Sequence, residues 1–506
     1  MEGSVRITGS TLDGPGVLMV ARNRARVEIA PEAAKRMRAA HEVLAAAAAR
    51  GEPIYGVTTG LGSRVVETVD GADGGEYSLR TLRGRATAVG EPLPEEVVRA
   101  AMVVRLNGLC AGGAGTSPAV ADGLAAMLNA GIHAVIPSSG SIGASDLCLL
   151  AHLGLALIGE GEAYLAGERL PAGRALERAG LAPIPLEAKD GLAICSSSAV
   201  SSGTAALALL DAEAALAEAQ VSAALALEAL RANLSPIDPR VTAARPAPGQ
   251  AWSAEGLHRL LAGAALLEPG AARRLQDPLS FRCVSQVHGS LRFALDQLRT
   301  AVGPELNGAA DNPVVLVADE QVLSTGNFHV PALALALDAV AIGLAQIAAP
   351  LAERGARLRA ERVSGLPPSL VSGDPTRSGV APLGKTAQAL VLEIRHAAAP
   401  LAILSGVGAD GVEDDSTGAT QAALRVRDQL DRVRRLIAIE LVVACQALEL
   451  REPVRLGAGT QAAYLLVREL VSPLDDDRPL GVDVERLTDA ALVRGQLLER
   501  VEAALA

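Results

Sequence analysis

The chain has very few aromatic residues. Of its 506 residues, 2% are Phe, Trp or Tyr, whereas 50% are hydrophobic overall. A hydrophobic core must therefore be built from Ala, Leu and Val. Because Ala and Leu are strong helix formers and small side chains let helices approach closely, this composition favours long, closely packed helices.

Cysteine is also scarce, and its spacing excludes two classes of site. No C-x-x-C pair occurs, so the pattern suggests neither a disulfide framework nor a zinc site. The N-terminus, MEGSVRITGSTLDG, lacks the apolar core of a signal peptide, and we therefore expect a cytoplasmic protein. The five cysteines are Cys110, Cys148, Cys195, Cys283 and Cys445.

Basic residues are outnumbered by acidic ones. The chain has 46 Lys and Arg against 57 Asp and Glu, which gives a formal net charge of -11. A surface that binds polyanions needs clustered Lys and Arg. We therefore expect no nucleic acid partner.

One apolar run, which begins at Pro331, is nearly long enough to span a membrane. Asp338 and Gln346 interrupt it, and an unpaired Asp inside a bilayer is costly. The run therefore predicts a buried helix of a helical bundle, and we expect no membrane partner.

Apolar residues recur at spacings of three and four over long stretches, which is typical of helices. The pattern predicts one long helix from about residue 203 to Pro236 and others through 331–363, 381–405 and 417–452. Four such helices can form a bundle. Residues 1–200 have shorter apolar runs with frequent Gly and Pro, so we expect a smaller mixed region there. Residues 201–506 form the bundle, in one continuous globular unit.

The stretch GSIGASDL, from Gly140 to Leu147, joins a Gly-rich loop to a predicted helix. Ser145 or Asp146 can cap that helix, and a plain cap is the simplest interpretation. A helix N-terminus also stabilises negative charge. A glycine-loop nucleotide site is less well supported, because the stretch lacks both the P-loop lysine and the Rossmann spacing.

Together with the CLLAHLGLALIGEGEA that follows it, this stretch resembles the signature of the histidine and aromatic amino-acid ammonia-lyases. In that family an Ala-Ser-Gly triplet followed by Asp-Leu cyclises into the electrophile methylidene-imidazolone. Here Ala144 and Ser145 are in place, but the Gly is missing and Asp146 follows directly. The resemblance implies that 4-methylideneimidazol-5-one forms from Ala144, Ser145 and Asp146, with no metal. It also implies a mainly α fold with long central helices and a homotetramer whose active sites take residues from more than one chain.

Three further motifs are similar to those of the same family. IYGVTTGLG places Tyr55 where the lyases have a general base, although a loop tyrosine packed on a neighbour is the simpler interpretation. LRTLRGRATAVGEPLP places Arg85 where histidine lyases have a substrate-recognising His, although a lone Arg is usually a surface residue. QDPLSFRCVSQV places Arg282 at the Arg that binds the substrate carboxylate, and Leu279 replaces a Tyr that assists catalysis.

The remaining substrate-binding predictions come from four short segments. In GLAICSSSA, Ser196 replaces an Asn that helps to hold the substrate and the prosthetic group. ADNPV and STGNFH place Asn312 and Phe328 at a polar contact and a ring-packing contact. GVEDDST places Glu413 at a Glu that reaches the substrate. Without the resemblance, the simpler interpretations are that ADNPV is a turn, that GVEDDST is a helix cap and that His329 is a structural histidine.

These observations predict an enzyme that eliminates or shifts the α-amino group of a small-molecule, amino-acid-like substrate. Arg85 suits an anionic or carbonyl-rich substrate, so we expect an amino acid other than histidine. The changes at residues 146, 196 and 279 leave a second interpretation open. In that alternative, the chain has the lyase fold without the prosthetic group and has changed chemistry or only binds a ligand, because fold alone does not determine chemistry.

Overall fold

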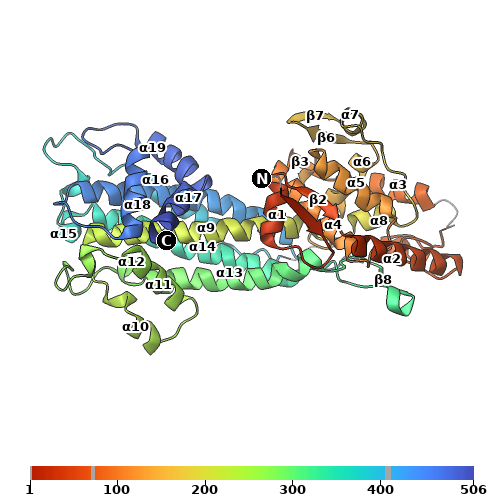
Figure 1. Cartoon of the computed structure of the whole chain (residues 1–506), viewed down its shortest axis with the longest axis horizontal. Helices are drawn as coiled ribbons and strands as arrows, with labels where there is room; N and C mark the ends of the chain where they lie inside the picture. The colour runs from red at the N-terminus through yellow and green to blue at the C-terminus, as the bar shows by residue number, and fades with distance from the viewer. Residues whose placement is uncertain (1–2, 70–73, 405–411) are drawn as a thin grey trace. The chain divides into compact units, whose positions relative to one another are not determined.

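The computed structural model describes residues 3–69, 74–404 and 412–506 (Figure 1). The structure is 60% helical with few strands, which confirms the predicted mainly α class. The chain forms two compact units, each assembled from three segments. The first unit comprises Met1–Leu210, Leu298–Leu337 and Pro400–Leu424; the second comprises Asp211–Gln297, Asp338–Ala399 and Arg425–Ala506. The predicted division near residue 200 stays a prediction.

The first unit contains short helices and small sheets. Its short helices are α1 (Gly14–Ala21), α2 (Pro31–Ala49), α3 (Gly74–Arg85), α4 (Glu95–Cys110), α5 (Pro118–Asn129), α6 (Leu147–Leu157), α7 (Ala172–Arg178) and α8 (Asp190–Cys195). Strands β1 (Ser4–Ile7) and β2 (Arg26–Ile29) pair in parallel. The other sheets are antiparallel. One pairs β3 (Val89–Pro92) with β5 (Pro137–Ser139), and another pairs β8 (Val314–Leu316) with β9 (Gln321–Leu323). The third has three strands, in which β6 (Glu162–Leu165) lies between β4 (Ile132–Ala134) and β7 (Glu168–Pro171).

The longest helices are α9 (Ala199–Leu230), α13 (Val284–Asn307), α14 (Pro331–Leu358) and α17 (Ala419–Glu449) (Figure 1). Three of the four predicted long helices are therefore confirmed. The prediction for 381–405 was too long, because α16 (Leu383–His396) ends shortly before Pro400, whose ring disfavours helical backbone in the preceding residue. The pattern also missed α13, whose apolar periodicity is interrupted by Gly289, Gly303 and Pro304.

Shorter helices complete the second unit: α10 (Pro239–Ala244), α11 (Gln250–Leu260), α12 (Leu279–Arg282), α15 (Glu361–Ser364), α18 (Ala458–Leu470), α19 (Leu480–Leu487) and α20 (Gln496–Leu505). In this unit a buried carboxylate joins three of the long helices. Glu440 on α17 accepts hydrogen bonds from Ser222 on α9 and Arg354 on α14. Glu440 and Arg354 are both fully buried, so the pair fixes the register of these helices.

Small residues permit close helix contacts, as the composition predicts. A Cβ on Gly203 of α9 would lie 2.8 Å from the carbonyl carbon of Ala100 in α4, so glycine is required where these two helices touch. Most of α4 is buried on all sides, from Val97 to Cys110.

Among the residues that the structure describes, two helices are long and apolar enough to cross a membrane, by length and composition alone. The apolar window is entirely buried in the segment that includes α9, and 61% buried in α14. In α14, Asp338 is buried and forms an ion pair with Arg425, so its charge is compensated within the protein. This pairing accounts for an Asp inside an otherwise apolar helix.

Candidate functional site

The predicted triplet lies in a tight buried turn immediately before α6. Gly143 and Ser145 have φ of 82° and 64°, whereas Asp146 has φ of −98°. Only the left-handed region of φ strongly favours glycine. The third residue of the triplet therefore does not need glycine's conformational freedom, and an Asp with a Cβ is accommodated there.

The carboxylate of Asp146 holds two helices and a loop together. It is fully buried and accepts hydrogen bonds from the backbone N–H of Ser201 at 2.8 Å and from the hydroxyls of Ser141, Ser201 and Thr420 at 2.8–3.0 Å. Burial raises the pKa of Asp146, while these hydrogen bonds oppose the rise. Asp146 occupies the N-cap position of α6, but its side chain makes no cap bond to that helix. The side-chain cap predicted for α6 is therefore wrong, because the carboxylate instead caps the first turn of α9.

The backbone of Asp146 is also engaged. Its N–H donates to the carbonyl of Ser197 at 2.8 Å. The Ser197 hydroxyl is buried and has no hydrogen-bond partner among the described residues. An unpaired buried hydroxyl beside the turn is a donor available to a polar group formed there.

Tyr55 lies in a loop that is closed by its own hydrogen bonds. The Tyr55 hydroxyl accepts from the N–H of Gly62 at 2.9 Å. Thr58 accepts from Ile54 N–H and donates to the carbonyl of Glu52, both at 2.7 Å. The side chain of Thr58 therefore stabilises the loop itself.

Sequence reasoning missed a second tyrosine at this loop. Tyr77 of α3 donates from its hydroxyl to the carbonyl of Thr59 at 3.3 Å. Burial raises the pKa of Tyr77; the positive charge of Arg85 opposes this rise, and Tyr55 adds to it. The charges of Arg85 and Tyr55 therefore both act on Tyr77. No motif marks Tyr77, since its relation to Tyr55 arises only from the packing of α3 on the loop.

Arg85 is the last residue of α3 and is half-buried. Burial raises the pKa of the Cys195 thiol to about 12, and the nearby charge of Arg85 opposes that rise. Cys195 immediately precedes Ser196, so the charge of Arg85 acts close to the predicted site. No carboxylate among the described residues forms an ion pair with Arg85, which leaves its charge available to a ligand.

The structure brings Ser196, Asn312 and Phe328 together. The Ser196 hydroxyl accepts from the N–H of Asn312 at 3.3 Å, and the neighbouring Ser198 donates to the carbonyl of Phe328 at 2.8 Å. The side-chain oxygen of Asn312 accepts from the N–H of Thr325 at 3.0 Å, so this oxygen is partly committed to its own loop.

Two buried cations hold the segment around Asn312. Arg105 forms an ion pair with Asp311 at 2.6 Å, and both side chains are buried. Lys189 donates to the carbonyl of Pro313 at 2.6 Å. Burial lowers the pKa of Lys189 to about 8, although Asp311 opposes this shift. These two buried side chains therefore hold the segment around Asn312 in place.

Glu413 is half-buried in the first unit, in the segment that precedes α17. The first unit thus contains all but two of the predicted residues. Leu279 and Arg282 belong to the second unit, where they begin and end α12. Leu279 is 63% exposed, and the Nε of Arg282 is buried without an acceptor among the described residues. An unpaired buried guanidinium nitrogen is suited to an anion such as a carboxylate.

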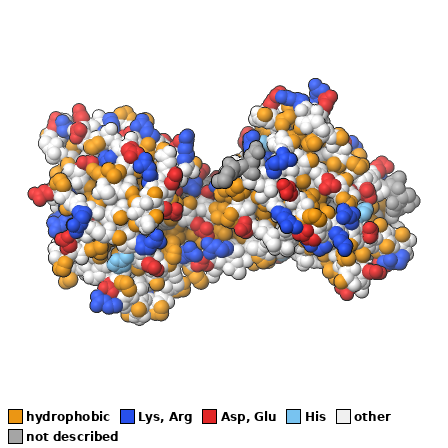
Figure 2. Space-filling model, in the orientation of Figure 1, with side chains coloured by type: hydrophobic (Ala, Val, Ile, Leu, Met, Phe, Trp, Pro, Cys, Tyr) orange, Lys and Arg blue, Asp and Glu red, His pale blue; other side chains and the backbone are white. Residues whose placement is uncertain are grey.

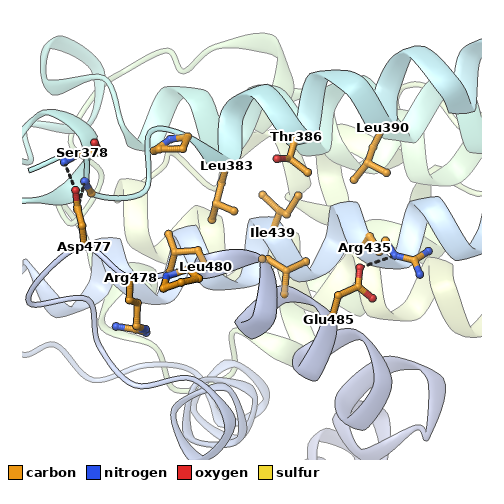
Figure 3. A pocket seen from close by; sticks show the side chains of 15 residues that line it. Ser378, Leu383, Thr386, Leu390, Arg435, Ile439, Asp477, Arg478, Leu480 and Glu485 are labelled. Carbon is orange, nitrogen blue, oxygen red and sulfur yellow. Dashed lines mark hydrogen bonds and ion pairs between the residues drawn. The ribbon is translucent and has the colours of Figure 1, made fainter.

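A cavity of about 420 Å³ lies in the second unit, between α16, α17 and α19 (Figure 3). Leu383, Ile439 and Leu480 form its apolar part, and the ion pair between Arg435 and Glu485 borders it. None of the predicted site residues lines it.

The face of the molecule in Figure 2 shows Lys and Arg interspersed with Asp and Glu. Among the described residues, no group of three or more His, Cys, Asp or Glu could hold a metal ion.

Comparisons with known proteins agree on one family. The sequence pattern of the aromatic amino acid lyases matches residues 12–469. Histidine ammonia-lyase of Stigmatella aurantiaca is 40% identical over 502 residues, which are 99% of this chain and 98% of that protein. Histidine ammonia-lyase of Symbiobacterium thermophilum is 40% identical over 496 residues, which are 98% of each chain.

Solved structures give the same result. Ergothionase from Treponema denticola superposes with a TM-score of 0.93 at 31% identity, covering 98% of this chain and 99% of that one. Tyrosine aminomutase from Streptomyces globisporus superposes with a TM-score of 0.94 at 31% identity, covering 99% of each. The similarity thus extends over nearly the whole chain and includes both lyases and aminomutases.

Proposed function

This chain belongs to the aromatic amino acid lyase family, and from that premise we propose that it eliminates or shifts the α-amino group of an amino acid other than histidine. The observation that supports this substrate class is Arg85, a cation without an ion-pair partner among the described residues, whose charge acts on both Tyr77 and Cys195. A fixed guanidinium repels a protonated imidazole and favours an anionic or carbonyl-bearing side chain.

We propose that 4-methylideneimidazol-5-one forms from Ala144, Ser145 and Asp146. The residues fit this group, because Asp146 has a negative φ and its side chain is held on α9. Closure gives up the hydrogen bond from Asp146 N–H to Ser197. Once formed, the ring supplies an electrophile for the substrate amine.

The side chains around this turn have the chemistry that elimination requires. Tyr55 is the proposed base for the weakly acidic β-proton. Arg282, whose Nε is buried without an acceptor among the described residues, is the proposed clamp for the substrate carboxylate. Ser196, Asn312 and Glu413 are proposed polar contacts, Phe328 and Leu279 proposed apolar ones. Arg282 and Leu279 belong to the second unit, and a homotetramer would allow another copy of the chain to supply them.

Intact-mass spectrometry of the freshly purified chain tests the prosthetic group. We expect a mass lower than the sequence mass by two water molecules, with the loss located by peptide mapping to residues 143–147. A chain of full sequence mass would favour the alternative, a lyase-fold protein with changed chemistry or a binding role.

Substrate choice is tested by ammonia release and by product analysis over the proteinogenic amino acids. We expect Arg85→His to raise turnover of histidine and to lower that of the best substrate. Histidine as the best substrate of the unaltered chain would contradict the proposed specificity.

We also propose a cytoplasmic location, which is supported by five free cysteines and is testable by cell fractionation.

A further inference from the structure

His329 lies directly beside the triplet. Its backbone forms an isolated antiparallel bridge with Ala144, and its N–H donates to the carbonyl of Gly326 at 2.9 Å. Residues paired in such a bridge have Cα atoms about 5 Å apart. The imidazole is 26% exposed, so it is accessible to a small molecule.

The imidazole ring of His329 is held by the carboxylate of Asp415. Its Oδ2 lies 3.2 Å from Nε2 of His329. The segment of Asp415 is itself bound to the turn, because Thr417 donates from its hydroxyl to the carbonyl of Gly143 at 2.9 Å and Gly418 N–H donates to the carbonyl of Ile142 at 3.1 Å. Both members of the pair are therefore anchored to the loop that contains the triplet.

The pairing decides which ring nitrogen is basic. A carboxylate accepts a hydrogen bond from Nε2–H, so in neutral His329 the lone pair is on Nδ1. No described residue forms a hydrogen bond with Nδ1. A base oriented by a carboxylate, with its second nitrogen unoccupied, is the arrangement used for proton transfer.

Elimination of an amino group requires a second proton transfer besides removal of the β-proton. At neutral pH the substrate nitrogen is an ammonium group without a lone pair, so it must lose a proton before it can attack an electrophile. Tyr55 is already assigned to the β-proton, and its hydroxyl lies in a different loop. The amino group therefore needs a base of its own.

We infer that His329, oriented by Asp415, is this base, an inference that rests on the lyase chemistry proposed above. Nδ1 accepts one proton from the α-ammonium group, which leaves a neutral amine and an imidazolium. When the C–N bond breaks, its electron pair stays on nitrogen and the imidazolium returns the proton, so that ammonia is released and His329 is neutral again. Asp415 is a positioning residue, which holds the tautomer and the orientation of the ring.

The kinetic test compares His329→Gln, Asp415→Asn and Asp415→Glu with the unaltered protein, using the amino acid with the highest turnover in the panel. We expect His329→Gln to lower kcat by about 100-fold or more with KM nearly unchanged. It should also abolish the acidic limb of the pH–rate profile. Asp415→Asn should lower kcat by less than His329→Gln does, and Asp415→Glu should lower it by less than Asp415→Asn does. Asp415 is the titratable residue that contacts His329. Glu413 and Asp414 are in the same segment of the chain as Asp415.

A second measurement needs no turnover. Diethyl pyrocarbonate acylates unprotonated imidazole nitrogens, and peptide mass spectrometry gives a rate for each histidine. We expect Asp415→Asn to slow acylation of His329 several-fold, and the best substrate to protect it. His396, which is exposed on α16, is the matched control and should be unaffected.

The outcomes separate the inference from the proposed function. If His329→Gln keeps kcat within threefold while the mass shows a cyclised triplet, the inference is overturned and the proposed function stands. If the unaltered chain is inactive on the whole panel, the proposed function fails, and the acylation rates decide the inference alone. Equal rates in the unaltered protein and Asp415→Asn would then reject the pairing.

Discussion

At the scale of single residues, Asp146 combines two roles. It is the last residue of the proposed prosthetic group, and its carboxylate binds the first turn of α9 and a hydroxyl of α17. A buried carboxylate with this many donors cannot be removed without leaving the donors unpaired, and each unpaired buried group costs about 1–3 kcal/mol. The turn and the two helices therefore depend on the same side chain.

We expect Asp146→Ala to lower the melting temperature markedly, and Asp146→Asn to lower it less, because an amide oxygen retains an acceptor for Ser201 and the hydroxyls. Differential scanning fluorimetry of the two variants checks this order. Equal melting temperatures for both variants and the unaltered protein would show that the hydrogen bonds contribute little to stability.

A second buried carboxyl, Glu218 on α9, is not paired in this way. It is fully buried, neither oxygen has a hydrogen-bond partner among the described residues, and Arg434 approaches it only to 3.9 Å. Burial raises the pKa of Glu218 to about 8, Arg434 opposes the rise and Asp211 adds to it. The folded chain therefore binds this proton more tightly than the unfolded chain.

A raised folded-state pKa contributes stability at low pH that is lost as pH rises through about 8. We expect Glu218→Gln, which stays neutral, to raise the melting temperature at pH 9 and to change it little at pH 5. Glu499→Gln, at an exposed position of α20, is the control. A melting temperature that depends on pH equally in both variants would contradict the assignment.

At the scale of helices, close packing depends on glycine at defined positions. Gly203 of α9 lies against the backbone of Ala100 in α4, where an added Cβ would come within 2.8 Å. Alanine has a higher helix propensity than glycine by about 1 kcal/mol, but overpacking a tight contact costs about 1–3 kcal/mol. At this position the steric effect should exceed the propensity.

We therefore expect Gly203→Ala to lower the melting temperature and Gly84→Ala to raise it slightly. Gly84 is near the end of α3, and an added Cβ meets nothing within 4 Å there. The pair separates packing from propensity, because both substitutions are the same in chemistry. A rise in both variants would show that α9 and α4 can move apart without loss.

At the scale of the whole molecule, the long helices leave large apolar side chains uncovered. On α14, Leu335 is 67% exposed and Ile342 is 40% exposed, and a spacing of seven residues puts them on one face of the helix. Exposed apolar surface of this kind marks interaction sites. It supports the proposed homotetramer, in which another copy of the chain would cover this face.

Light scattering of the purified protein should give about four times the chain mass of 51.5 kDa. We expect Leu335→Glu combined with Ile342→Glu to give a smaller species, because a charge buried in an apolar contact is costly. Val482→Glu, at a 60% exposed position of α19, should leave the mass unchanged. A monomeric unaltered chain would contradict the proposal.

The sequence by itself determined the fold class, because helix formation depends on local composition and periodicity. Few aromatics, abundant Ala and Leu, and spacings of three and four predicted α9, α14 and α17 within a few residues. Motifs likewise predicted Tyr55, Arg85, Ser196 and Asn312 as site residues, because each lies in a short segment that resembles a motif of the family.

Only the tertiary structure decided which of these side chains meet and what each one contacts. The bond from Ser201 to Asp146 joins residues 55 positions apart, and that from His329 to Asp415 joins residues 86 apart. No local pattern encodes such pairs, since they form when helices pack. For the same reason the sequence misassigned the Asp146 side chain to its own helix and left Tyr77 unnoticed, because burial and long-range contact determine the role of a polar group.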